Sequence, residues 1–129
     1  IWLHHGIGSG KIPGGGLNPL YHISSRIFAH IYLMGHRHAK EAVKLPWINH
    51  HVTMKGIIHE YHLNRVMAVC GGFLAGYKMG STGPSGLPAA GYIEKAMLPP
   101  TALGGIMLFI RPKMYHETGV PLIDVDVSI

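Results

Sequence analysis

The chain has 129 residues, a formal net charge of +5 and a mean hydropathy of +0.21, with 47% hydrophobic but only 13% charged residues. Soluble domains carry roughly 25% charged residues, so this chain has few charges to cover the outside of a solitary soluble enzyme. So much apolar surface also excludes a disordered polar tail. A single cysteine, Cys70, excludes a disulfide-stapled scaffold and a CxxC zinc ribbon. The composition favours a protein that keeps apolar surface against lipid or other proteins.

The basic residues are spread thinly along the chain, with no run of three. A nucleic-acid surface needs several cations on one face, so RNA binding becomes a minor alternative. The chain begins with Ile1 rather than methionine, which fits either a processed protein or a fragment of a longer one.

Residues 1–19 are rich in glycine and contain two prolines, which predicts an irregular arm. The stretch GIGSGK within it differs from a phosphate-binding loop at two required positions. His5 stands where the first glycine is needed, and Ile12 replaces the hydroxyl residue that binds magnesium. A nucleotide site is therefore not expected here.

Residues 20–44 are predicted to form an amphipathic helix. Apolar residues recur with the helical period at Ile23, Ile27, Ile31 and Met34. Asn18 is a suitable N-cap, Pro19 suits the first helical position, and Pro46 forces a stop. The helix is too polar to span a bilayer.

Residues 57–79 are predicted to form a transmembrane helix. The uncharged core covers only twelve residues, 66–77, whereas a lone spanning helix needs roughly 20 apolar residues. A span becomes possible if aromatic rings lie at interfacial depth and the flanking cations snorkel toward water. The residues expected at the membrane interface are Tyr61, Arg65, Tyr77 and Lys78.

A row of glycines at four-residue spacing follows in the same segment. Gly72, Gly76 and Gly80 would form one smooth ridge on a helix, which lets another backbone approach closely. The alternative is a glycine-rich helix end that leads into the loop at 80–92. We predict helix packing at the three glycines.

Residues 96–111 are predicted to form a second apolar helix, and residues 117–129 an extended tail. In the tail, Val125, Val127 and Ile129 alternate with Asp124, Asp126 and Ser128. This alternation is typical of a strand that needs a partner's sheet or groove. The expected fold is mainly α: an amphipathic helix, one or two short membrane-associated helices, glycine- and proline-rich arms and a strand-like C-terminal tail.

Eleven histidines are the most unusual polar feature of the chain. On a helix, His59 and His62 would share a face, as metal ligands can, but HEYH is not the HExxH pattern of zinc proteases. A haem needs axial histidines in an apolar bundle, and only His30 or His62 lies near such a segment. No GxSxG motif occurs, no acidic pair lies in an apolar setting, and Cys70 lies in an apolar run where a thiol tends to be inert. We therefore expect no catalytic residue, metal or cofactor.

The pattern Lys55, Glu60, Leu63, Arg65 before an apolar segment resembles cytochrome c oxidase subunit VIIa, over about a dozen positions. The glycine row after Arg65 is similar to the GxxxG helix of subunit e of mitochondrial ATP synthase. Both resemblances imply a small subunit of a mitochondrial inner-membrane complex. The chain departs from the first family in its long extensions and its second apolar segment.

The sequence thus predicts a non-catalytic structural or assembly subunit of a mitochondrial respiratory-chain complex, with cytochrome c oxidase favoured. Its expected partners are other subunits and lipid, without nucleic acid or a small-molecule substrate. The alternatives are a subunit of the ATP synthase membrane region, an organellar ribosomal protein, and a haem- or metal-binding membrane subunit.

Overall fold

The computed structural model describes residues 1–6, 15–37, 39–72, 103–114, 119 and 121–129. Within these residues 58% lie in strands and 8% in helix, so the prediction of a mainly α fold is wrong. The elements follow the order β1 (Trp2–His4), α1 (Asn18–Ser24), β2 (Ile31–Met34), β3 (Glu41–Val52), β4 (Ile58–Val69), β5 (Met107–Met114) and β6 (Pro121–Ser128).

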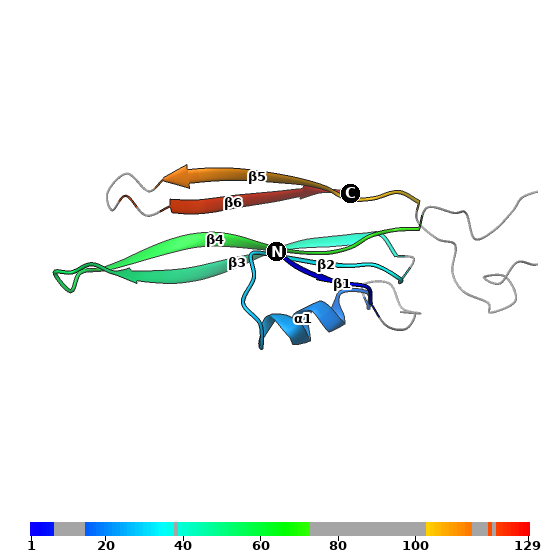
Figure 1. The fold of residues 1–129 in the computed structure, drawn as a ribbon, viewed down its shortest axis with the longest axis horizontal. Coiled ribbons are helices and arrows are strands. Elements are labelled where there is room, and N and C mark those ends of the chain that lie inside the picture. Colours follow the sequence, from blue (N-terminus) through cyan, green and yellow to red (C-terminus); the bar gives the residue numbers. More distant parts are fainter. Residues whose placement is uncertain (7–14, 38, 73–102, 115–118, 120) are drawn as a thin grey trace, which may run out of the picture.

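The strands form a four-stranded sheet and a separate two-stranded hairpin. The larger sheet has the order β1-β2-β4-β3, with β2 parallel to both of its neighbours and β3 antiparallel to β4. The β5–β6 hairpin covers one face of this sheet, and α1 lies against the other (Figure 1). The described part of the fold therefore has three layers.

Each face of the larger sheet has its own core, because side chains alternate across a strand. Toward α1 lie Leu17, Leu20, Ala29, Tyr32, Met34, Met67 and Val69. Toward the β5–β6 hairpin lie Ile31, Val66, Ala68 and Val125. The end of β4 is therefore buried on both faces, which explains its uninterrupted apolar run.

The predicted helix over 20–44 is wrong beyond its first two turns. The helix runs only over Asn18–Ser24, with Pro19 in its first turn. Its N-cap is Leu17, so the prediction of Asn18 as N-cap is wrong. The hydroxyls of Ser24 and Ser25 donate hydrogen bonds of 2.8 Å to the carbonyl oxygens of Tyr21 and His22. Such bonds compete with helix continuation, and the chain beyond them forms strand β2, which begins at the β-branched Ile31.

The predicted transmembrane helix over 57–79 is also wrong in its described part, because Ile58–Val69 form β4. The apolar run that suggested a helix core is the centre of the sheet, paired with both β2 and β3. In the described ranges, no helix has the length and apolar character needed to cross a membrane.

The C-terminal half of the chain also differs from the expected helix over 96–111. Residues Met107–Met114 form β5, while residues 96–102 lie outside the described part. The expected strand near the C-terminus is confirmed as β6, but it pairs with β5 of its own chain. Trp2–His4, expected in an irregular arm, form the edge strand β1.

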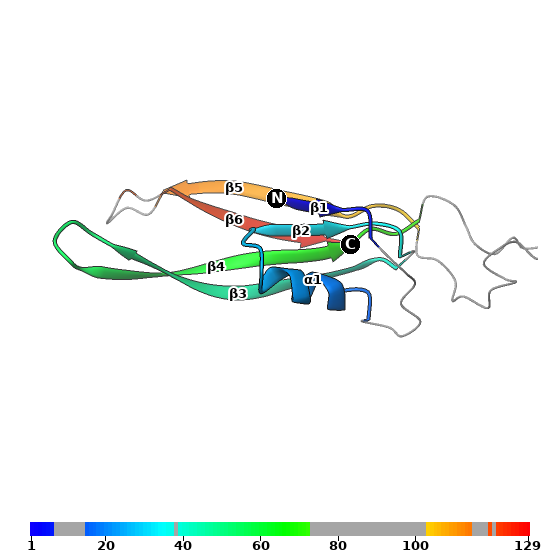
Figure 2. The ribbon, with the colours of Figure 1, turned by 60° about the horizontal axis from the view of Figure 1, so that its bottom comes forward.

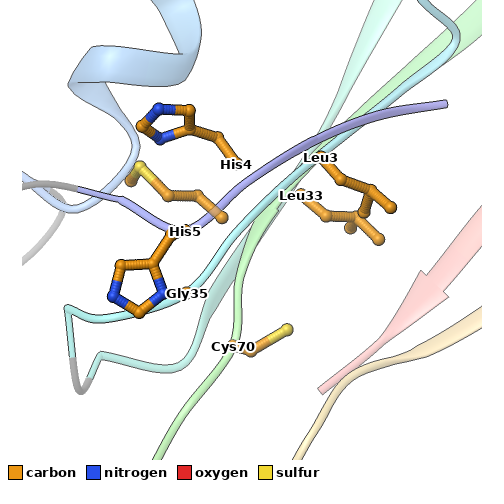
Figure 3. Close-up of a pocket in the computed structure, with 7 residues that line it drawn as sticks. Leu3, His4, His5, Leu33, Gly35 and Cys70 are labelled. Atoms are coloured by element: carbon orange, nitrogen blue, oxygen red, sulfur yellow. The ribbon is translucent and has the colours of Figure 1, made fainter.

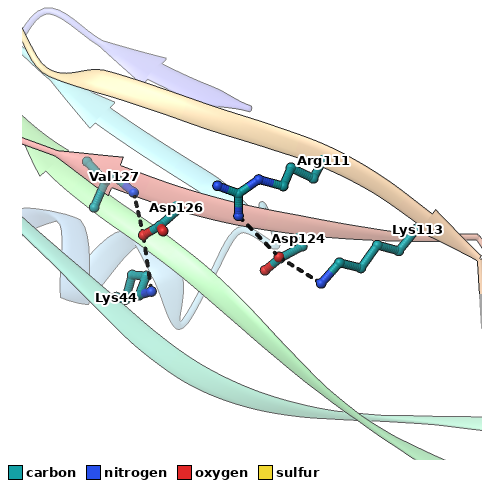
Figure 4. Close-up of polar contacts among 6 residues, drawn as sticks. All are labelled: Lys44, Arg111, Lys113, Asp124, Asp126 and Val127. Atoms are coloured by element: carbon teal, nitrogen blue, oxygen red, sulfur yellow. Dashed lines mark hydrogen bonds and ion pairs between the residues drawn. The ribbon is translucent and has the colours of Figure 1, made fainter.

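One ion pair joins the two sheets, and another lies within the β5–β6 hairpin. Lys44 of β3 reaches Asp126 of β6 at 3.1 Å, and Lys113 of β5 reaches Asp124 at 2.9 Å (Figure 4). The hydrogen bond from Lys44 lowers the pKa of Asp126, and that from Lys113 lowers the pKa of Asp124. Since these side chains are well exposed, their contribution to stability is small and weakens with salt.

Candidate docking surface on the β3–β4 hairpin

The β3–β4 hairpin extends well beyond the other strands of its sheet (Figures 1 and 2). Strand β2 pairs with β4 only from Val66 to Val69, so the rest of β4 is paired on one side alone. At about 3.3 Å per residue, a twelve-residue strand reaches roughly 40 Å. The far end of the hairpin is thus held away from the two cores.

The far end of the hairpin carries large apolar side chains with no cover from the described residues. We define the apolar tip as the exposed residues Val52, Met54, Ile57 and Ile58. Scattered exposed hydrophobic residues are ordinary, but a contiguous group of them marks an interaction surface. The apolar tip is such a group, since Val52 and Ile58 are direct cross-strand partners.

The turn that presents the apolar tip is well defined. The backbone N–H of Thr53 donates to the carbonyl oxygen of Ile57 at 2.9 Å, and that of Ile57 donates to Thr53 Oγ1 at 3.2 Å. Gly56 has φ of 75°, a left-handed conformation that favours glycine. The tip is therefore presented on an ordered turn.

Closer to the core, the Arg65 side chain is enclosed between two aromatic rings. Its guanidinium carbon lies 3.5 Å from the centroid of the Trp47 ring and 4.4 Å from that of Phe28. Arg65 is only 4% exposed, and its Nε is buried without a hydrogen-bond partner in the described part of the chain. Desolvated cation–π contacts are worth about 2 kcal/mol each, against a burial cost of several kcal/mol per ion. The two rings therefore offset only part of the cost of burying this charge.

A cleft of about 250 Å³ opens beside this stack, where the hairpin meets the start of β6. Its lining residues are Phe28, His30, Asn49, His50, His51, Tyr61, Leu63, Pro121, Leu122 and Ile123. Glu60, the acid on the adjoining stretch of β4, lies 3.1 Å from His50. The cleft thus combines apolar walls with three imidazoles.

His30, at the rim of this cleft, has its pKa lowered from the ordinary 6.5. Burial is the main cause, and the charges of Arg65 and of the chain's N-terminus add to it. Phe28 packs edge-on against the ring at 5.3 Å between centroids. Burial and the two positive charges disfavour the imidazolium in the folded state.

The lowered pKa of His30 predicts a loss of stability on the acid side. Below about pH 6.5 the unfolded chain binds this proton more readily than the folded chain, so the free energy of unfolding falls until the folded pKa is reached. Urea titrations between pH 7.5 and pH 5 measure this slope. His30→Gln is expected to flatten it, whereas His22→Gln, at an exposed position, serves as the control. An unchanged slope in His30→Gln would contradict the assignment.

His59 and His62 do not share a face as they would on a helix. His59 and His62 lie three apart on β4, so their side chains point to opposite faces, and the predicted shared face is wrong. The described residues contain no group of three histidine, cysteine, aspartate or glutamate side chains that suits a metal ion.

A second pocket, of about 280 Å³, lies at the other end of the sheet and contains Cys70 (Figure 3). Cys70 follows β4 and is half-buried, with its backbone N–H bonded to Met34. Figure 3 shows the Cys70 thiol directed away from the rings of His4 and His5. His4 Nδ1 accepts a hydrogen bond of 2.9 Å from the N–H of Gly6. We find no nucleophile–base arrangement among these side chains.

The residues predicted for helix packing and membrane contact are spread over different settings. Gly72 forms a bridge with Leu103, and its carbonyl accepts a 3.0 Å hydrogen bond from Gly104. Tyr61 and Arg65 lie buried in β4. Gly76, Tyr77, Lys78 and Gly80 lie outside the described residues.

Sequence reasoning missed Trp47 and Phe28, which enclose Arg65, and it missed the apolar tip. Residues 45–56 were assigned no element, although Gly56 between two β-branched stretches is a hairpin signal. The aromatic stack has no sequence signal, because Phe28 reaches Arg65 from the loop after α1.

Comparisons of this chain with protein-family models, with curated proteins and with solved structures find no match.

Proposed function

We propose that this protein is a non-catalytic structural subunit of a larger assembly, and that the apolar tip of its β3–β4 hairpin docks against a partner protein. The apolar tip carries this proposal, because Met54 is fully exposed while Val52, Ile57 and Ile58 are more than half exposed. Burial of such residues in a partner removes apolar area from water, at about 25 cal/mol per Å². The ordered turn lowers the entropic cost of docking.

The charge of the hairpin supports a protein partner better than RNA. Besides the enclosed Arg65, its cations are Lys44 and Lys55, and its acids are Glu41 and Glu60. These four charges cancel, whereas a phosphate-binding surface needs a cluster of cations. An organellar ribosomal protein is therefore the weaker alternative.

The location of this assembly in the mitochondrial inner membrane stays a prediction from sequence resemblance. The residues that carry the resemblance to cytochrome c oxidase subunit VIIa, from Lys55 to Arg65, form a turn and a strand here. A respiratory-chain complex, and the ATP synthase as its alternative, remain the complexes to examine first. A haem- or metal-carrying subunit receives no support from the described residues, in which no metal-binding group occurs.

The double substitution Met54→Asp and Ile57→Asp is expected to release the protein from its assembly without unfolding it. Both residues are exposed, and surface substitutions usually change stability by only about 0.5 kcal/mol. Two carboxylates buried at an interface should weaken association at least tenfold. Native gel electrophoresis of detergent-solubilised membranes, with circular dichroism of the purified variant, measures both quantities.

Met114→Asp is the control, because Met114 is also an exposed methionine and lies at the end of the other hairpin. This variant should migrate with the assembly like the wild type. Co-migration of the tip variant at wild-type level would contradict the proposal, as would a wild type that migrates alone. Binding of the wild type to protein-free vesicles, lost in the tip variant, would instead assign the tip to lipid.

A further inference from the structure

The outer part of β4 has an open backbone edge. Thr53 and Ile57 form a hydrogen-bonded pair at the turn. Hydrogen-bonded and non-hydrogen-bonded pairs alternate along an antiparallel ladder. The N–H and C=O groups of odd-numbered β4 residues therefore point toward β3, and those of even-numbered residues point away from it. The N–H of Val66 accordingly points the other way, to the carbonyl oxygen of His30 at 2.9 Å. Before Val66 no described strand pairs with this side. The edge groups belong to Ile58, Glu60, His62 and Asn64.

By contrast, the outer edge of β3 is protected, because two of its positions offer no free N–H group to another strand. Pro46 lies opposite Asn64 in a pair whose N–H groups point outward, and proline has no N–H to offer. The outward N–H of His50 is bonded to Asn49 Oδ1 at 2.9 Å. Proteins commonly protect edge strands in such ways. The hairpin thus has one protected edge and one open edge.

The open edge ends beside a buried positive charge with no carboxylate partner among the described residues. Arg65 follows Asn64, its guanidinium lies over the rings of Phe28 and Trp47, and its Nε has no hydrogen-bond partner there. The described acids are engaged or distant: Glu60 pairs with His50, Asp124 with Lys113, Asp126 with Lys44, and Glu41 lies opposite Val69.

We propose that the open edge of β4 docks an extended acidic segment of a partner protein, which adds a strand to the sheet and brings a carboxylate to Arg65. Such a segment would lie in line with β2, with one end at Phe28 and His30 and its side chains in the cleft beside Tyr61 and Leu63. Backbone hydrogen bonds would supply affinity, and charge complementarity at Arg65 would select acidic sequences. This inference rests on the proposed structural role and names the chemistry of the partner.

The test uses the full chain and a capped heptapeptide of alternating threonine and valine with a glutamate at each end. Its counterpart has glutamine at both ends. Glutamates at both ends allow either strand direction to bring a carboxylate to Arg65. Calorimetry measures Kd, and amide exchange reports on the edge groups. We expect the glutamate peptide to bind at least tenfold more tightly, with affinity that falls as salt rises, and to slow exchange at Glu60, His62 and Asn64.

A pair of proline variants separates the open edge from general damage to the hairpin. His62 and Ile48 are cross-strand partners whose N–H groups both point outward, His62 to the open edge and Ile48 to the protected one. His62→Pro should weaken peptide binding at least tenfold, whereas Ile48→Pro should leave it unchanged. Arg65→Met should remove the preference for glutamate over glutamine. If Arg65→Met fails to fold, the two peptides on the wild-type chain still decide this point.

Each of three results would overturn the inference. These are equal affinity for the two peptides, no binding at millimolar concentration, and equal effects of the two proline variants. A dimer seen by sedimentation and abolished by His62→Pro would assign the edge to a second copy of the chain and overturn it as well. These results are distinguishable from failure of the structural role, which is read from the tip variant on native gels with Arg65 and His62 intact.

Discussion

Replacement of Leu20 by alanine is expected to lower the free energy of unfolding by about 2–5 kcal/mol. Leu20 is fully buried and joins α1 to Tyr32 and Met67 on the sheet. A seven-residue helix is unstable alone, so its packing on the sheet is what maintains it. The substitution removes three carbon atoms and leaves a cavity that the short helix fills only partly. Urea denaturation followed by circular dichroism measures the change.

The neighbouring residue provides the control for this substitution. Tyr21 lies on the exposed side of the same helix, and Tyr21→Ala should cost far less than Leu20→Ala. Equal costs for the two variants would mean that α1 does not dock through Leu20.

Replacement of Val125 by aspartate is expected to detach the β5–β6 hairpin from the larger sheet. Val125 is fully buried at the centre of the second core, against Val66 and Ala68. A carboxylate there has no cationic partner in the core cluster, and an uncompensated buried charge costs on the order of 3–5 kcal/mol. Limited proteolysis should show faster cleavage within residues 103–129 while β3 and β4 stay protected.

Ile110 lies directly opposite Val125 in the hairpin and is about half exposed. Ile110→Asp should therefore preserve docking to a much greater degree. Wild-type resistance to proteolysis in Val125→Asp would show that the two layers are held together by other contacts, such as Lys44 with Asp126.

The extent to which the sequence predicts this fold differs from element to element. The alternation of valines and aspartates in β6 specifies a strand by itself, because one face is apolar and the other polar. In β4, residues Val66–Val69 are apolar without interruption, a pattern shared by buried strands and buried helices. Pairing with β2 and β3 decides for a strand. Both sets of partners lie far from Val66–Val69 in sequence, so no local signal reveals the pairing.

The prediction of a helix over 20–44 is wrong for a related reason. Its apolar residues have a helical period, yet Ile27 and Ile31 are β-branched and Ser24 and Ser25 offer the backbone competing hydrogen bonds. Local signals could have placed the end of the helix near Ser24. The parallel pairing of β2 with β1 depends on residues about thirty positions apart and has no local signal.

The candidate site was predicted less well than the strands. The composition predicts apolar surface that is kept against a partner, and the described apolar surface lies on a hairpin tip instead of a helix. The sequence predicts Arg65 at a membrane interface, because it directly precedes the apolar run that starts at Val66. Its enclosure by Phe28 and Trp47 arises from tertiary structure alone.

The length of the β3–β4 hairpin separates two kinds of evolutionary constraint along one strand. From Val66 onward, β4 is packed on both faces, so each substitution there must satisfy two cores at once. Toward Ile58, outside both core clusters, the described neighbours of these side chains are on the partner strand, so substitutions there leave the cores untouched. Descendants of this chain could therefore acquire new binding partners by drift at the turn while inheriting an unchanged scaffold.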